Sequence, residues 1–303
     1  MDRLFPTWLF DILKRQFLLD NIFEIRIRLN KPIVVNYLGS YKLILSDNGY
    51  IKKPFLATRE LIEYILSVAT KQSVYAYNDE MKQLFLSYDG GIRIGLCGTV
   101  IYDGERVLSL KNISSLCIRF AHEIIDCSKK VINVLCSSEK VKNTLIISPP
   151  GMGKTTMVRD ISRLLSDTKK IDNILIVDER FEIAGSGEKM LETGQRSDVL
   201  SGCKKSFAFD YALKTMNPKV IITDEISSEN DIEAIKRCIR SGVSVIATAH
   251  SDGISSLKTK PYFEYLIKEK YFERIVQMSA SIAGKVDAIF DENLRAIYYC
   301  ELL

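Results

Sequence analysis

The chain has 303 residues, a length that predicts about two domains. Hydrophobic residues make up 47% and charged residues 26%, which is ordinary for a globular protein whose core needs no disulfides or metal. The formal net charge of +4 is too small to argue by itself for a nucleic-acid or membrane partner.

Targeting and membrane signals are missing from the sequence. No apolar run reaches the ~18–20 residues that a membrane-spanning helix needs. Asp11, Lys14 and Arg15 interrupt the N-terminal apolar stretch, so it does not resemble a signal peptide. We therefore expect a cytoplasmic protein with no membrane span.

The cysteines also favour a reducing compartment. Seven are present, and no two form a Cys-x-x-Cys pair, which argues against a disulfide framework or a zinc site. Neither His122 nor His250 has metal-ligand spacing to a cysteine. The cysteines are Cys97, Cys117, Cys127, Cys136, Cys203, Cys238 and Cys300.

The chain begins with a predicted helix and a set of antiparallel strands. Apolar residues at helical spacing predict a helix over residues 7–19, with Thr7 as its N-cap. Its apolar face would pack on its own domain or meet a membrane or partner. Alternating residues over 24–29, followed by 33–38 and 42–45, predict strands joined by tight turns.

The next segment predicts a helix and a second hairpin. Thr58 is expected to cap a helix that ends at Ala69. Residues 92–101 and 106–110 predict a hairpin that turns at Asp103-Gly104, and Arg119 closes another strand. These elements make a small α+β domain.

Residues 124–143 predict a helix that is polar on one side. We place the domain boundary there, with an N-terminal domain of residues 1–128 and a nucleotide-binding domain of residues 129–303. The segment is also the expected hinge for domain rotation.

The second half predicts an α/β fold. Short apolar runs at 144–147, 174–177, 220–223 and 243–248 are separated by helical patterns, as in a parallel sheet. Each of these predicted strands ends in a polar or charged residue. Because ligands bind beyond the carboxyl ends of strands in such sheets, these ends define the expected site.

The first of these strands leads into a P-loop, residues 148–156, and then a helix. Gly151 and Gly153 let the backbone wrap around a phosphate, Lys154 supplies positive charge, and the Thr155 hydroxyl can ligate magnesium. Ser148 stands where the usual pattern has glycine, and we expect it to be tolerated because the phosphate-binding amides lie downstream. The sequence thus predicts binding of ATP with Mg²⁺. The nucleotide-binding residues are expected to be Pro150, Gly151, Met152, Gly153, Lys154, Thr155 and Thr156.

Two later strands end in Asp-Glu, at Asp178-Glu179 and Asp224-Glu225. We expect the strand over 220–223 to lie beside the P-loop strand. Asp224 would then hold magnesium through water, and Glu225 would orient and deprotonate the attacking water. The first pair, with Arg180, either reaches the same site or forms a structural ion-pair cluster.

Further charged groups are candidates for catalysis. His250 follows the fourth strand and would sense the γ-phosphate through the water, unless it is an ordinary loop histidine. A neighbouring subunit would supply an arginine to the γ-phosphate. Arg93, Arg119 and Arg196 are the candidates, and each is also consistent with a surface arginine.

Several segments resemble the stage III sporulation protein AA family. The resemblance covers the chain from about residue 20 to its end, and the string over 193–202 makes it specific. The other matching segments are residues 90–98, 113–119, 148–160, 177–185, 221–226 and 247–250.

The resemblance implies a RecA-like P-loop ATPase domain behind a smaller N-terminal α+β domain, similar to the ATPases of type II and type IV secretion and pilus retraction. It also implies a homo-oligomer, a hexameric ring, that acts in endospore formation. The ring would lie peripherally at a membrane channel complex, on the mother-cell side. Asp178, Glu179 and Glu182 would match an acidic box of the secretion relatives, and His250 a histidine box.

Three functions remain open from the sequence. The first is a motor ATPase in which Glu225, Lys154, His250 and Glu179 are catalytic. The second is a nucleic-acid motor, for which Lys204-Lys205 beside Phe207 and Phe209 is the best surface patch; it is thin, so no nucleic-acid partner is expected. The third is a nucleotide-gated scaffold, against which Glu225 argues because a binding switch needs no base.

Overall fold

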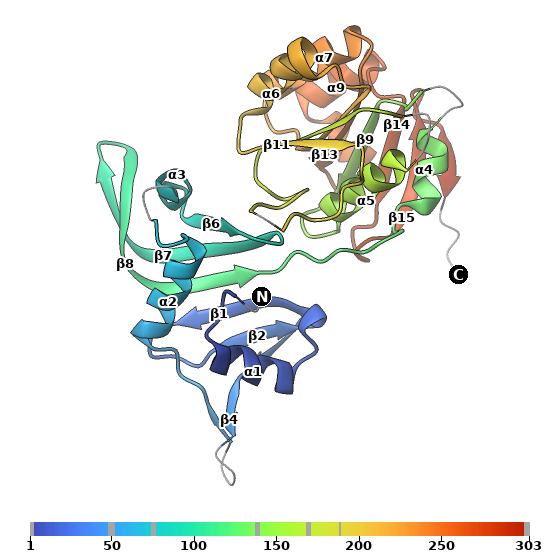
Figure 1. The fold of residues 1–303 in the computed structure, drawn as a ribbon. Coiled ribbons are helices and arrows are strands. Elements are labelled where there is room, and N and C mark those ends of the chain that lie inside the picture. Colours follow the sequence, from blue (N-terminus) through green and yellow to red (C-terminus); the bar gives the residue numbers. More distant parts are fainter. Residues whose placement is uncertain are drawn as a thin grey trace. The chain divides into compact units, whose positions relative to one another are not determined.

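The structure is a computed structural model that describes residues 3–47, 52–73, 77–136, 140–167, 171–187 and 189–299. It contains two compact units, drawn in Figure 1. Residues 1–122 with 185–190 form unit 1, and residues 123–184 with 191–303 form unit 2. The domain boundary expected between residues 128 and 129 stays a prediction.

Unit 1 is built on an antiparallel sheet in the order β3-β2-β1-β8-β7-β6. The alternation that predicted strands puts Ile25, Ile27 and Ile118 in a shared core. The separate strand that was expected to end at Arg119 is wrong. Arg119 is the last residue of β8, which runs without a break from the hairpin turn. The strands are β1 (Ile22–Arg28), β2 (Val34–Tyr37), β3 (Ser40–Leu43), β6 (Phe85–Tyr88), β7 (Ile92–Asp103) and β8 (Arg106–Arg119), with a small β4 (Leu45–Asp47) and β5 (Lys52–Pro54) pair beside them in sequence.

The helices of unit 1 are α1 (Thr7–Gln16), α2 (Arg59–Ala69) and α3 (Asn78–Lys82), with a 3-10 turn over Leu19–Asn21. Thr58 caps α2 as expected, because its hydroxyl accepts a hydrogen bond from the Leu61 amide. The cap expected at Thr7 is wrong: Pro6 occupies the N-cap, and the helix ends three residues before the expected end, at Gln16. Leu9 and Leu13 are fully buried, so α1 packs on its own unit.

Unit 2 contains a mixed sheet in the order β11-β10-β12-β13-β9-β14-β15-β16. The strands from β11 to β14 are parallel, and β15 and β16 continue the sheet antiparallel. We expected β12 to lie beside the P-loop strand β9. This expectation is wrong, because β13 lies between the two strands. The strands are β9 (Thr144–Ser148), β10 (Ile174–Asp178), β11 (Ser197–Ser201), β12 (Val220–Glu225), β13 (Ser244–His250), β14 (Arg274–Met278), β15 (Val286–Asp291) and β16 (Ala296–Tyr299).

Helices cover both faces of this sheet. One face packs on α4 and α5, and the other on α6, α7 and α9, so successive strand residues enter two different cores. The helices are α4 (Lys129–Leu135), α5 (Lys154–Ser166), α6 (Lys205–Tyr211), a π-helix (Ala212–Met216), α7 (Glu229–Arg240), α8 (Ile254–Lys258) and α9 (Pro261–Lys268). Within the described ranges, no helix has the length and apolar character needed to cross a membrane.

The single helix expected over residues 124–143 is wrong, because only α4 forms there and residues 137–139 lie outside the described residues. The segment before α4 is bound to α5 through Asp160. That carboxylate accepts hydrogen bonds from the amides of Asp126 (3.0 Å) and Ser128 (2.8 Å) and from the Ser128 hydroxyl (2.7 Å). This part of the expected hinge is therefore anchored within unit 2.

Cys300 also lies outside the described residues, and the other six cysteines are unbridged thiols.

Candidate functional site

The loop between β9 and α5 has the conformation that its glycines allow. Gly151 and Gly153 have φ values of 76° and 91°, in the left-handed region where a side chain would be strained. Gly153 is the N-cap of α5, and no side chain caps this helix or adds an acidic residue to its first turn. The first-turn amides of α5 therefore keep their capacity to bind an anion.

Lys154 begins α5, and its side chain is buried against the loop. The three N–H groups of its ammonium are shared among four acceptors: the carbonyl oxygens of Ser148 (2.8 Å) and Pro149 (3.0 Å), the Ser148 hydroxyl (3.0 Å) and a ring nitrogen of His250. The serine at the usual glycine position thus supplies an acceptor for the lysine. Burial lowers the pKa of Lys154 to about 8, against the opposing charge of Glu225.

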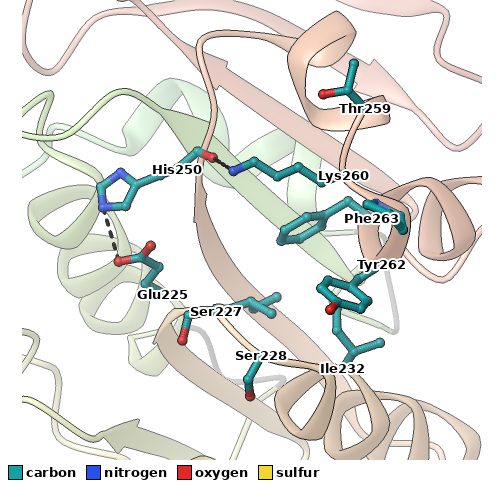
Figure 2. A pocket seen from close by; sticks show the side chains of 11 residues that line it. Glu225, Ser227, Ser228, Ile232, His250, Thr259, Lys260, Tyr262 and Phe263 are labelled. Atoms are coloured by element: carbon teal, nitrogen blue, oxygen red, sulfur yellow. Dashed lines mark hydrogen bonds and ion pairs between the residues drawn. The ribbon is translucent and has the colours of Figure 1, made fainter.

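His250 connects Lys154 with Glu225. The Lys154 ammonium lies 2.9 Å from His250 Nδ1, and His250 Nε2 lies 3.1 Å from a carboxylate oxygen of Glu225, the contact marked in Figure 2. An ammonium has only donors, so Nδ1 accepts and Nε2 carries the proton that it donates to Glu225. The structure thereby brings together three predicted site residues, from the start of α5 and the ends of β12 and β13.

Asp224 and Glu179 meet at a buried lysine that the sequence analysis did not assign to the site. Lys205 is only 3% exposed, and its ammonium lies 2.6 Å from Asp224 Oδ1 and 2.7 Å from Glu179 Oε2. Burial raises the pKa of Asp224 to about 6, while the positive charge of Lys205 acts in the opposite direction. The sequence could have indicated that Lys205 is buried, because it stands at helical spacing from the apolar Ala208, Phe209 and Ala212, which are buried.

The candidate nucleic-acid patch is wrong, because two of its four residues are buried. Lys205 and Phe209 lie in the interior, and of the proposed group Lys204 and Phe207 are exposed. The two exposed residues do not form the basic and aromatic surface that single-stranded nucleic acid binding requires.

Asp178 has a structural arrangement of its own. The side chain is fully buried and accepts hydrogen bonds from the amides of Glu182 (2.8 Å), Ile183 (3.0 Å) and Ala184 (2.8 Å). Burial raises its pKa, and these backbone hydrogen bonds oppose that change. Arg159 donates to the carbonyls of Glu182 and Ile183, so the loop after β10 is held from both sides. Asp178 therefore fixes the loop that follows Glu179.

Two oxygen donors fit a magnesium ion. Thr155 lies half-buried in the first turn of α5, and Asp224 lies at the end of β12. Asp224 Oδ2 is buried and has no hydrogen-bond partner among the described residues. An unsatisfied buried carboxylate oxygen is costly, and a hydrated cation would satisfy it.

The arginine candidates have local partners. The Arg93 guanidinium stacks over the Phe85 ring at 4.2 Å, and Arg119 lies 3.7 Å from Glu24, all within unit 1. Arg196 in unit 2 lies 3.4 Å from Asp172. Arg180 is exposed.

One hollow borders Glu225 and His250, and a second lies near the P-loop. The first, shown in Figure 2, has a volume of about 370 Å³ and lies between Glu225, His250 and the start of α9, where Tyr262 and Phe263 line it. The second, of about 260 Å³, is lined by apolar residues with two lysines and reaches Gly284. Gly284 is also next to the P-loop, because its amide donates to the Met152 carbonyl (3.0 Å). The second hollow is lined by Cys127, Lys130, Val131, Gly284, Lys285, Val286, Ile289 and Tyr298.

Comparison with solved structures shows which fold carries this site. The pilus retraction motor PilT with bound ADP has a TM-score of 0.61 at 17% identity, covering 89% of this chain and 76% of that chain. The Legionella pneumophila ATPase DotB has a TM-score of 0.57 at 13% identity, covering 92% and 77%. Unit 2 accordingly has the α/β, RecA-like P-loop fold of secretion and pilus-retraction ATPases, as expected.

The sequence comparisons extend over nearly the whole chain. Stage III sporulation protein AA of Bacillus subtilis (strain 168) is 37% identical over 278 residues, which are 89% of this chain and 87% of that protein. Residues 3–297 match the family model described as Sporulation stage III, protein AA. The chain therefore belongs to the Sporulation stage III, protein AA family.

Proposed function

We propose that this chain is a magnesium-dependent ATP hydrolase that acts as a ring-forming motor in sporulation. The observation that carries the proposal is the contact chain Lys154–His250–Glu225 at the carboxyl ends of β9, β12 and β13. It joins a phosphate-binding loop to a carboxylate with the reach and chemistry of a general base. A protein that only binds nucleotide has no need of this connection.

The proposed roles follow from the contacts. The P-loop amides and Lys154 hold the β- and γ-phosphates, with Lys154 turning from the Ser148 and Pro149 oxygens to the phosphates. Glu225 orients the attacking water and accepts its proton, while the His250 N–H holds the carboxylate in place. Thr155 and Asp224 would hold magnesium, which neutralises charge on the phosphate oxygens when bound.

The nucleobase has a suitable place in the second hollow. Its walls are mostly apolar, with Val131, Val286 and Tyr298 available to contact a flat ring, and it shares Gly284 with the environment of the P-loop. We propose that the adenine ring enters this hollow.

The wider role rests on the family and on the fold. We propose that the chain forms a homo-oligomeric ring of six subunits, because it shares its fold with the pilus retraction motor PilT. An arginine from a neighbouring subunit, Arg93, Arg119 or Arg196, would complete each site. Family membership supports work on the mother-cell side, peripheral to a membrane channel complex that leads to the forespore.

The test is steady-state phosphate release from the purified chain, wild type against Glu225→Gln, over a range of protein concentrations. We expect a rate per subunit that rises steeply with concentration and falls at least a hundredfold in the variant, because the base is lost while nucleotide binding remains. The matched control is Glu229→Gln, which removes the same charge from the first turn of α7.

Phosphate release that is absent from the wild type, or equal in wild type and Glu225→Gln, would contradict hydrolysis at this site. The nucleotide-gated scaffold would then describe the protein better, with the P-loop as a binding loop only.

A further inference from the structure

Lys205 connects the ends of two parallel strands inside unit 2. Its ammonium lies between Asp224 Oδ1 at the end of β12 (2.6 Å) and Glu179 Oε2 just after β10 (2.7 Å). The side chains of Lys205 and Asp224 are 3% and 5% exposed, whereas that of Glu179 is 35% exposed. Lys205 is thus an interior cation placed between two carboxylates.

The backbone that carries Lys205 is held in place. The Gly202 amide donates to the Asp178 carbonyl (3.1 Å), so the loop before α6 is bound to the end of β10. A Cβ on Gly202 would lie 2.8 Å from the Phe181 ring, and its φ of 73° also favours glycine. Ala208 and Phe209 of α6 are fully buried. The lysine therefore enters the site from a fixed position.

The two oxygens of Asp224 have different surroundings. Oδ1 contacts Lys205 and lies 3.5 Å from the Thr223 hydroxyl, whereas Oδ2 is buried without a partner among the described residues. Holding one oxygen fixes the rotation of the carboxylate and leaves the other oxygen available. We infer that Lys205 is a positioning residue for the magnesium–nucleotide site, which fixes Asp224 through Oδ1 so that Oδ2 faces the ion or its water.

A contribution to folding alone does not account for a lysine here. Buried ion pairs are often replaceable by apolar residues at little cost in stability. Asp224 and Glu179 would repel each other if they stood together without a cation, and Asp224 would lose its fixed orientation. Residues behind metal ligands commonly change metal affinity about 10- to 100-fold when they are altered.

The inference rests on the proposed function and is tested by equilibrium binding rather than turnover. The dissociation constant of ADP is measured by calorimetry on the full chain, once with excess Mg²⁺ and once with EDTA. Lys205→Met keeps the length of the side chain and removes its charge, whereas Lys205→Arg keeps the charge. Lys204→Met is the matched control, because it removes the same charge at an exposed neighbouring position.

We expect the Kd of Lys205→Met for ADP to rise about tenfold with Mg²⁺ and to change less than twofold with EDTA. Lys205→Arg should recover part of the Mg²⁺-dependent affinity, and Lys204→Met should match the wild type. Thermal unfolding without nucleotide identifies folded variants. If Lys205→Met is too unstable to measure, Lys205→Gln, which also removes the charge, takes its place with the same expected result and the same contrary results.

Three results would overturn the inference. Lys205→Met could keep the full Mg²⁺ effect, lose affinity equally with Mg²⁺ and EDTA, or bind more tightly with Mg²⁺ because the lysine had competed with the ion. Each presupposes a wild type that binds ADP in a Mg²⁺-dependent way. A wild type that binds no nucleotide would instead contradict the proposed function itself, and the inference with it.

Discussion

The two units place their buried charges differently. Among the described residues of unit 1, Glu24 is the one charged side chain that is buried, and its partners Arg26 and Arg119 are 37% and 67% exposed. Unit 2 buries many more and connects them with one another or with the backbone: Lys154, Arg159, Asp160, Asp178, Lys205, Asp224 and Asp231.

The difference shows what each sheet does for its unit. The antiparallel sheet of unit 1 closes one apolar core and leaves ion pairs at its margin, where they contribute little. The parallel strands of the mixed sheet in unit 2 direct several strand ends to one edge, so charged residues that are far apart in sequence meet in the interior. Part of the buried charge of unit 2, namely Lys154, Lys205 and Asp224, therefore lies at the candidate site.

Among the variants that test this contrast, Asp178→Ala should change the free energy of unfolding most. The variant leaves the part-buried amide of Glu182 and the buried amides of Ile183 and Ala184 without an acceptor, and we expect a loss of about 4 kcal/mol in the free energy of unfolding. Chemical denaturation of the full chain measures it. Glu24→Gln in unit 1 is the comparison and should cost less than about 1 kcal/mol, because its partners are solvent-exposed. Equal losses would contradict the contrast between the units.

Lys154→Ala is expected to reduce nucleotide affinity at least a hundredfold, about 3 kcal/mol, because it removes the buried ammonium from the P-loop. Isothermal calorimetry with ADP and Mg²⁺ measures the change. Lys214→Ala, in the π-helix, removes the same charge and should bind normally. Unchanged affinity in Lys154→Ala would refute the assignment of the P-loop.

The pH response of Mg²⁺-dependent binding should be smaller and should come from Asp224. Burial raises the pKa of this acid to about 6, so it is ionised at pH 7.5 and mostly protonated at pH 5. A neutral carboxyl is a poor partner for a hydrated cation, and we expect affinity to fall about tenfold over this range. Asp224→Asn reports the titration of the nucleotide together with all other groups of the protein. A step of equal size in wild type and Asp224→Asn would exclude Asp224 as its source.

Local patterns in the sequence predicted much of the fold. The apolar runs gave β9, β10, β12 and β13, and the glycines with Lys154 located the start of α5. These signals are local because strand burial and loop conformation depend on neighbouring residues. The cap at Thr7 and the helix over 124–143 failed where spacing alone was used, since Pro6 and Asp160 determine the backbone there.

Long-range order was harder to predict. The position of β13 between β9 and β12 depends on the crossover of the whole chain, and no local pattern specifies it. The contact of Lys205 with Asp224 and Glu179 has the same origin, because the ends of β10 and β12 and the start of α6 must first be assembled. Roles assigned to Asp224, Glu225 and the P-loop residues stay predictions.

The oxygens around Lys154 have a consequence for the timing of a reaction cycle. Ser148 and Pro149 accept hydrogen bonds from the ammonium, so a phosphate that binds as proposed would have to compete with their oxygens for it. On departure of the product the exchange would run in reverse, and the ammonium would return to the oxygens of the loop. We expect this internal competition to weaken ground-state binding and to speed emptying of the site, which a machine that repeats its stroke requires.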